Sequence, residues 1–283
     1  MTANFLEEDA FSISDYIFVG DDGVIFSKGI KYKLDDFSWN SITYGNGKYI
    51  AVGTRGNITT SSDGVNWTNP EMIGNSRSWF SVTFSNGKYV ASGNGYIAVS
   101  TDAANWTVNK ISNTTDRVWN DVKYYNGKFI AVGASGYVAT SSDGSTWTET
   151  KVGTHDFESV SYGNGKYVLV ESNGYINCST DFVNWDRVKI SVTELYSSTY
   201  GNNKFVVTSY GYIHYSADGI NWEEVAFGDN VWKEIIFKDN YFFTLENNGY
   251  IGKSADGIVW KSTGIMESNG SRVRFLNGFC GIK

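Results

Sequence analysis

The chain has 283 residues, of which 41% are hydrophobic and 16% aromatic, so it can bury a large core. Its formal net charge is −7, and its six arginines stand in no basic run, which excludes the basic surface typical of nucleic-acid-binding proteins. No apolar stretch approaches the roughly 18 residues that a membrane-spanning helix needs. The 31 glycines and single proline favour a chain with many tight turns. Cys178 and Cys280 are expected to be free thiols with no disulfide between them.

The first predicted elements lie at 16–25, where the sequence YIFVGDDGVI indicates two strands joined by a turn. The first complete unit follows, with short predicted strands at 39–44, 48–53, 56–61 and 66–68. Asn46-Gly47 stands between the first two of these strands. Asn-Gly is a strong hairpin signal, because both turn residues must adopt a positive φ. The unit therefore predicts an antiparallel meander of four strands.

The segment between the third and fourth strands recurs along the chain. Copies of Ser-x-Asp-(Gly)-x-x-Trp occur at 61–67, 100–106, 141–147, 179–185, 216–222 and 254–260. Their tryptophans are 39, 41, 38, 37 and 38 residues apart. A period of this size is typical of a β-propeller, in which each repeat forms one blade. Catalytic residues do not come in six copies, so we interpret the serine and aspartate as turn residues and the tryptophan as packing between neighbouring blades.

The two ends of the sequence complement each other. Residues 16–25 match the second and third strands of a unit, and 273–279, VRFLNGF, match a first strand with its Asn-Gly turn. We therefore expect one all-β domain over 1–283, a seven-bladed β-propeller of four-stranded antiparallel blades. Six full repeats cover about 39–270, and one blade is split between 16–36 and 271–283. Joining the N- and C-terminal strands in one blade closes the ring and removes exposed sheet edges.

The repeated motif resembles the Asp-box, or BNR repeat, of sialidase-type propellers, with one residue fewer between aspartate and tryptophan than the commonest form. The fuller unit, YGNGKYIAVG with its turn and tryptophan, is similar to repeats in bacterial and phage-encoded recognition or lectin-like propellers. This resemblance covers about 16–279. It implies the propeller fold, and it is shared by enzymes, lectins and scaffolds.

An enzymatic function is not expected. Sialidases, which the repeat resembles, use three arginines and an Arg-Ile-Pro segment, and this sequence has no Arg-Ile-Pro. The adjacent acid pairs, such as Asp35-Asp36 and Glu223-Glu224, would point to opposite faces of a strand. His155 and His214 lie in different units, so neither a metal nor any other cofactor is expected. Glycoside hydrolysis is kept as the third alternative.

The leading hypothesis is recognition of a carbohydrate or cell-surface polymer, such as a receptor for a phage-tail or bacteriocin-associated module. A tyrosine recurs after the turn between the second and third strands, with polar residues before it. Aromatic rings stack on sugars, and amides or hydroxyls bond their hydroxyl groups. The predicted ligand-binding residues are Tyr96, Tyr137, Tyr175, Tyr212, Tyr250, Asn94, Asn173, Asn248 and Arg55. The alternative for the tyrosines is that they pack between neighbouring blades.

The second hypothesis is a protein–protein assembly scaffold that binds a partner on one face. It predicts an exposed apolar patch, for which the longer loops at 69–79, 108–119 and 262–273 are candidates. Met72 and Met266 lie in these loops. The acidic first residues lack the features of a signal peptide. We therefore expect a cytoplasmic protein or a component of a phage or bacteriocin-like particle, with no nucleic-acid partner and no membrane span.

Overall fold

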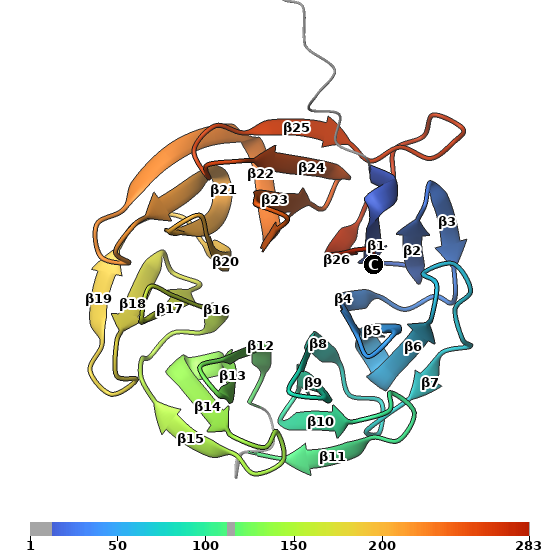
Figure 1. The fold of residues 1–283 in the computed structure, drawn as a ribbon, viewed down its shortest axis with the longest axis horizontal. Coiled ribbons are helices and arrows are strands. Elements are labelled where there is room, and N and C mark those ends of the chain that lie inside the picture. Colours follow the sequence, from blue (N-terminus) through green and yellow to red (C-terminus); the bar gives the residue numbers. More distant parts are fainter. Residues whose placement is uncertain (1–12, 112–116, 283) are drawn as a thin grey trace, which may run out of the picture.

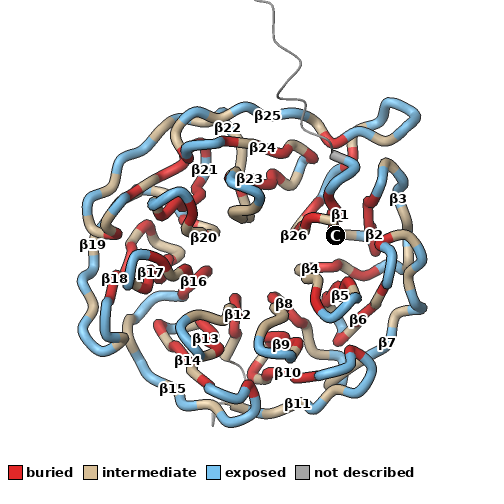
Figure 2. The backbone as a smooth tube through the Cα atoms, in the orientation of Figure 1, coloured by how far each residue is buried: buried red, intermediate tan, exposed pale blue. Residues whose placement is uncertain are grey.

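The computed structural model describes residues 13–111 and 117–282, which form an all-β ring of radially arranged sheets. Figure 1 views the ring along its axis, with the chain running around it from blue to red. In the four sheets β4–β7, β8–β11, β12–β15 and β16–β19 the chain starts near the centre and steps outwards, whereas in the sheet at the chain ends the innermost strand is the last one, β26. The core lies in the middle strands, while the outermost strands carry most of the exposed residues (Figure 2).

Five sheets have four strands each. The sheet at the chain ends contains β26 (Leu276–Gly281), β1 (Tyr16–Gly20), β2 (Val24–Ser27) and β3 (Ile30–Lys33). The next contains β4 (Trp39–Gly45), β5 (Lys48–Gly53), β6 (Asn57–Ser61) and β7 (Glu71–Met72). It is followed by β8 (Trp79–Ser85), β9 (Lys88–Gly93), β10 (Tyr96–Ser100) and β11 (Thr107–Lys110).

The chain continues through β12 (Trp119–Tyr125), β13 (Lys128–Gly133), β14 (Tyr137–Ser141) and β15 (Thr148–Lys151), and then β16 (Phe157–Gly163), β17 (Lys166–Glu171), β18 (Tyr175–Ser179) and β19 (Asp186–Lys189). The last sheet has six strands: β20 (Leu195–Gly201), β21 (Lys204–Ser216), β22 (Glu223–Lys238), β23 (Tyr241–Glu246), β24 (Tyr250–Ser254) and β25 (Lys261–Gly264). Short 3-10 turns occur at η2 (Ile13–Asp15), η3 (Thr54–Gly56) and η4 (Ala134–Gly136). No helix in the described residues is long and apolar enough to cross a membrane.

The predicted count of seven separate four-stranded blades is wrong, because the strands form six sheets, one of them six-stranded. The sequence units that end in Trp222 and Trp260 share this sheet. In the other units the backbone pairing ends at the fourth strand. Here it continues into the next unit, since Tyr210 pairs with Val231 and Tyr212 with Ala226. The residues between these two units therefore belong to β22 and are not a free linker.

The expected joining of the two chain ends is confirmed. β26 pairs antiparallel with β1, with Ile17 opposite Cys280 and Val19 opposite Gly278. The expectation of a turn at Asn277-Gly278 is wrong, since both residues lie within β26. The side-chain amide of Asn277 instead donates to Asp21 Oδ1 at 2.8 Å and to the carbonyl of Trp39 at 3.1 Å. These bonds tie the last strand to the β1–β2 turn of its own sheet and to β4 of the next sheet.

The repeated Ser-x-Asp segments form the same hydrogen-bonded turn. In the copy at 141–147, Ser141 Oγ bonds to Asp143 Oδ1 at 3.0 Å and accepts the N–H of Gly144. Asp143 Oδ1 accepts the N–H groups of Ser145 and Thr146 at 2.8 and 2.7 Å. These N–H groups lower the pKa of Asp143 to about 2, because they stabilise the ionised carboxylate. The N–H of Thr146 has the largest effect, followed by that of Ser145.

Each turn places its tryptophan against the preceding unit. Trp147, for example, packs with Val90, Ile97 and Val99 of the sheet before it. Six hydrophobic clusters of this kind each contain one turn tryptophan: Trp67, Trp106, Trp147, Trp185, Trp222 and Trp260. All six tryptophans are partly buried, so their packing joins neighbouring units while one side of each ring stays near the surface. The two halves of the six-stranded sheet also face each other across such a cluster.

We predict that removing residues 276–283 abolishes cooperative unfolding, because β1 loses its inner partner strand and an unpaired edge opens the ring. Calorimetry of the shortened and full chains measures this directly. A single transition with an unchanged midpoint in the shortened chain would contradict the closure described above.

We also predict that Asp143→Ala lowers the thermal midpoint most strongly near pH 7. The folded-state pKa of about 2 lies below the ordinary value of about 3.9, so the carboxylate stabilises the fold above pH 4 and loses that contribution as pH falls towards 2. The difference in midpoint from the wild type should therefore narrow between pH 4 and pH 2. Asp143→Asn, which keeps an acceptor oxygen, serves as the matched control. Its thermal midpoint should lie between those of the wild type and Asp143→Ala. A difference that does not change with pH would refute this account of the turn.

Candidate functional site

The five predicted tyrosines lie at equivalent positions around the ring but not in one pocket. Tyr96, Tyr137, Tyr175 and Tyr250 are the first residues of β10, β14, β18 and β24, and Tyr212 lies within β21. Because these strands follow one another around the ring (Figure 1), no single cavity collects the five rings. Any ligand site built on one tyrosine would therefore be local to its own part of the ring.

Arginine side chains lie over four of these five rings. The guanidinium carbons are 3.3–4.1 Å from the ring centroids, in the pairs Arg77–Tyr96, Arg117–Tyr137, Arg187–Tyr175 and Arg272–Tyr250. Two of the arginines also form short ion pairs, Arg117 with Glu149 and Arg187 with the buried Glu171. A sugar that stacked on these ring faces would have to displace the guanidinium groups. Sugar binding along the rim remains a prediction.

The predicted polar residues have mostly local roles. Asn248 bonds through its backbone and side-chain nitrogens to the carboxylate of Glu246, at 3.0 and 2.8 Å. Asn94 forms an isolated bridge with Val118. Arg55 is exposed and adopts a positive φ of 58° in η3. Asn173 has a buried Oδ1 for which no hydrogen-bond partner is found. These four residues do not form a common site.

Tyr212 differs from the other rim tyrosines, because no cation lies over its ring in the described part of the chain and 42% of its surface is exposed. Its ring centroid is 6.5 Å from that of His214, whose pKa burial lowers to about 4. His214 Nε2 lies 3.0 Å from Ser209 Oγ, so this imidazole is neutral and held within the core at pH 7. The geometry gives a small exposed aromatic surface beside a structural histidine.

The centre of the ring holds a compact group of charged side chains. Lys123 forms an ion pair with Asp121 at 3.1 Å, and Glu234 Oε2 accepts the N–H of Phe279 at 3.0 Å. Burial raises the pKa of Glu234 to about 7. The cavity beside them, about 330 Å³, is also lined by Lys238. Asp121 also accepts from Ser81 of β8 and from the N–H of Val160 of β16, and Glu234 bonds to β26, so we assign these groups to holding the inner strands together.

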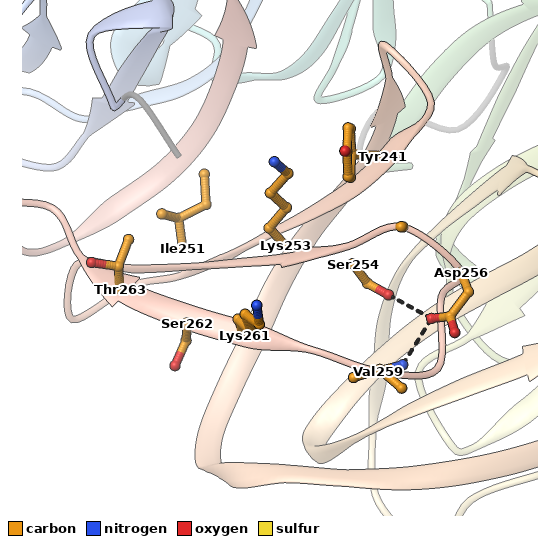
Figure 3. A pocket seen from close by; sticks show the side chains of 10 residues that line it. Tyr241, Ile251, Lys253, Ser254, Asp256, Val259, Lys261, Ser262 and Thr263 are labelled. Carbon is orange, nitrogen blue, oxygen red and sulfur yellow. Dashed lines mark hydrogen bonds between the residues drawn. The ribbon is translucent and has the colours of Figure 1, made fainter. Parts of the chain in front are cut away.

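A larger pocket of about 450 Å³ lies on the face of the β23–β24–β25 sheet (Figure 3). Ile251 pairs with Thr263 and Lys253 with Lys261, so these four side chains share one face. Figure 3 shows Tyr241, Ile251 and Lys253 on the same side of the β24–β25 hairpin. The Lys253 ammonium lies 3.8 Å from the centroid of the Tyr241 ring. The pocket therefore has an apolar floor with two lysines on it.

This pocket opens where the turn of the next unit is missing. Elsewhere the turn glycine packs on the preceding unit: a Cβ added to Gly219 would lie 2.9 Å from Cys178 Sγ. Cys178 stands one residue before Ser179 in β18, as Lys253 stands one residue before Ser254 in β24. The unit that follows β25 around the ring is the one formed by the two chain ends. There β2 and β3 are joined by Lys28-Gly29 alone, and both residues have a positive φ. The cluster between β1–β2 and β23–β24 accordingly contains no turn tryptophan among its described members.

The same difference appears at the start of β23. Lysines begin the second strand of other units and donate to the carbonyl of the next unit's turn aspartate: Lys48 to Asp102, Lys88 to Asp143, Lys166 to Asp218 and Lys204 to Asp256. In β23 the first residue is Tyr241, and no such turn follows it. Our sequence reasoning missed this pocket, although the break in the lysine series and the lack of the motif after residue 27 both mark it.

The longer loops, which the scaffold hypothesis needs to expose an apolar patch, carry two exposed methionines. Met72 and Met266 are exposed, at 60% and 44%. The loop at 262–273 contributes Ser262 and Thr263 to the pocket, and in the loop at 108–119 residues 112–116 lie outside the described residues. The two cysteines are free, as expected. Within 13–111 and 117–282, no group of three or more His, Cys, Asp or Glu residues could hold a metal ion.

No protein-family model matches this chain, and no curated protein matches its sequence.

Solved structures with the same fold do match. The chain is similar to YCF48 bound to a D1 peptide, with 15% identity, a TM-score of 0.65, and coverage of 89% of this chain and 85% of the other. YCF48 from Cyanidioschyzon merolae gives 18% identity, a TM-score of 0.62 and coverage of 83% and 86%. Virginiamycin B lyase from Staphylococcus aureus gives 13% identity, a TM-score of 0.73, and coverage of 88% of this chain and 87% of the other. These neighbours are β-propellers and include both a peptide-bound protein and an enzyme, so at these identities they show that this chain has the propeller fold and nothing about its activity.

Proposed function

We propose that this chain is a non-enzymatic β-propeller that binds a protein partner, and that the partner docks a side chain in the pocket on the β23–β24–β25 face. The observation that carries this proposal is the open pocket of about 450 Å³, with Ile251 and Tyr241 among its apolar lining and Lys253 and Lys261 at its surface. Pockets that bind ligands are typically concave and mostly apolar, with a few polar groups that set orientation.

The position of the pocket supports a protein ligand. It lies on a sheet face that, in other units, contacts polypeptide of the same chain. The fold is compatible with this use, since YCF48, a structure of similar fold, is described with a bound peptide. The exposed Met266 lies just beyond β25, and methionine is an adaptable contact residue at binding surfaces.

The lectin hypothesis has less support from the contacts. It needs open aromatic faces, and arginines lie over four of the five rim tyrosines. We keep the relation of the repeats to the Asp-box as a proposal, supported by the shared pattern in which serine and aspartate cap the same turn. In this proposal the motif is structural wherever it occurs.

The test selects peptides from a random library for binding to the wild-type chain. Their binding is then compared with that to a variant whose pocket is filled by a larger side chain. Thr263→Trp places an indole on the pocket face of an exposed strand position, and Thr150→Trp makes the same change at the equivalent position of β15. We expect selected peptides to bind the wild type and Thr150→Trp equally. Binding to Thr263→Trp should be at least about tenfold weaker, or about 1.4 kcal/mol.

Both variants must first show the wild-type thermal transition. Peptides that bind Thr263→Trp as tightly as the wild type would place recognition elsewhere on the ring. Selection that yields no binding peptide would count against protein binding altogether.

A further inference from the structure

One unit of the ring shows how this fold holds an arginine side chain. Arg117 stands two residues before the first residue of β12, and its guanidinium carbon lies 3.3 Å from the centroid of the Tyr137 ring. Its Nη1 donates to Glu149 Oε1 at 2.5 Å. Tyr137 and Glu149 share one face of β14–β15, since Ala139, two residues after Tyr137, pairs with Glu149. The tyrosine ring and the carboxylate together hold the guanidinium group.

The same tyrosine and glutamate recur in the six-stranded sheet, but the arginine does not. Tyr212 and Glu224 are related by the same register, since His214, two residues after Tyr212, pairs with Glu224. The residue two before the start of β20, in the place of the arginine, is Thr193. Thr193, Tyr212 and Glu224 all line one pocket of about 360 Å³. The two groups that hold a guanidinium are therefore present here, and the space beside them is open.

Both groups are accessible in this pocket. The Tyr212 ring is exposed, and within the described residues no cation lies over it. The Glu224 side chain is 55% exposed, against 24% for Glu149 under its arginine. Glu224 Oε2 lies 3.5 Å from His214 Nδ1, but burial lowers the pKa of His214 to about 4, so this imidazole is neutral at pH 7. The histidine therefore does not cancel the negative charge of Glu224.

Lys189 also lines the pocket and brings a positive charge to it. It is the last residue of β19, opposite Tyr175, and its Nζ lies 5.5 Å from the centroid of that ring. Lys110 has the same position at the end of β11, opposite Tyr96, in the sheet that precedes Arg117. A lysine at this position is therefore compatible with an arginine in the neighbouring unit.

We propose that this pocket binds the side chain of an arginine in a partner polypeptide. The site is separate from the pocket on the β23–β24–β25 face and does not depend on it. The guanidinium group stacks on Tyr212 and donates a forked pair of hydrogen bonds to Glu224. Val192 lines the same pocket and is 94% exposed, so a polypeptide that inserts an arginine also covers this side chain. Arginine next to exposed aromatic and aliphatic side chains is typical of protein interfaces.

The smallest probe is N-acetyl-arginine amide, titrated into the isotope-labelled full chain and followed by NMR. We expect saturable shifts at the backbone amides of Thr193, Tyr212 and Glu224. N-acetyl-citrulline amide, which has nearly the same shape without the charge, should bind at least about tenfold more weakly. N-acetyl-lysine amide should also bind more weakly, because an ammonium group lacks the planar fork of donors.

Protein variants locate the effect. Glu224→Gln should weaken binding of the arginine probe about tenfold, whereas Glu71→Gln, the same change on the exposed outer strand β7, should leave it unchanged. Thr193→Arg returns an arginine to the position that Arg117 has in its own unit, and it should abolish binding because it fills the site. One variant removes the carboxylate and the other occupies the pocket, so either decides the question if the other fails to fold.

The outcomes are distinct from those for the proposed function. Equal binding of the arginine and citrulline probes, or undiminished binding to Glu224→Gln, would overturn the inference. Free arginine that binds at least about tenfold more tightly than the peptide TDRV, the sequence of 115–118, would make the amino acid the ligand and would also overturn it. Thr263→Trp should bind the arginine probe as the wild type does, so each site can fail without the other.

Discussion

The contact on which the ring depends is the packing of each Ser-x-Asp turn against the strands of the preceding unit. The turn is internally satisfied, because serine and aspartate accept the backbone N–H groups that would otherwise be unpaired. It can therefore present its tryptophan and the residue after the aspartate, which is glycine in four copies, Ala103 in one and Phe182 in one, as a compact apolar surface. A lysine of the preceding unit bonds to the turn's backbone carbonyl and adds a polar contact beside the apolar one.

This contact is missing at one place in the ring, and the candidate site lies there. Where β2 and β3 are joined by Lys28-Gly29, the turn and its tryptophan are missing, and Tyr241 stands where the lysines of other units donate. The inner part of the face is still covered, since Phe243 packs on Tyr16 with ring centroids 5.0 Å apart. The outer part is open, and this combination of a covered core and an open rim suits a binding pocket on a stable fold.

Much of the fold could be predicted because its determinants are local and periodic. The Asn-Gly turns, the Ser-x-Asp motifs and the matching ends at 16–25 and 273–279 are visible in the sequence, and the pairing of β26 with β1 follows from them. The blade count failed because the pairing of Tyr210 with Val231 joins residues that, in sequence, look like a loop and a linker. No local sequence pattern predicts that pairing.

The site was harder to predict for a different reason. The tyrosine rim recurs in the sequence, but the arginines that cover it do not recur with it: Arg77 and Arg117 each stand two residues before the first tryptophan of a unit, whereas Arg187 lies within β19. The pocket depends on what one unit lacks, and a search for recurring residues passes over such a feature. Comparing Tyr241 with the lysines at the equivalent positions would have pointed to it.

The most direct measurement restores the missing turn. Replacing Lys28-Gly29 by the seven-residue turn Ser-Ser-Asp-Gly-Ser-Thr-Trp, copied from 141–147, supplies the tryptophan that this part of the ring lacks, and the same graft ending in alanine is the control. If the pocket is open because this turn is missing, the tryptophan graft will have a higher thermal midpoint than the alanine graft and will no longer bind ligands of the pocket. Equal midpoints and unchanged binding in the two grafts would contradict the account.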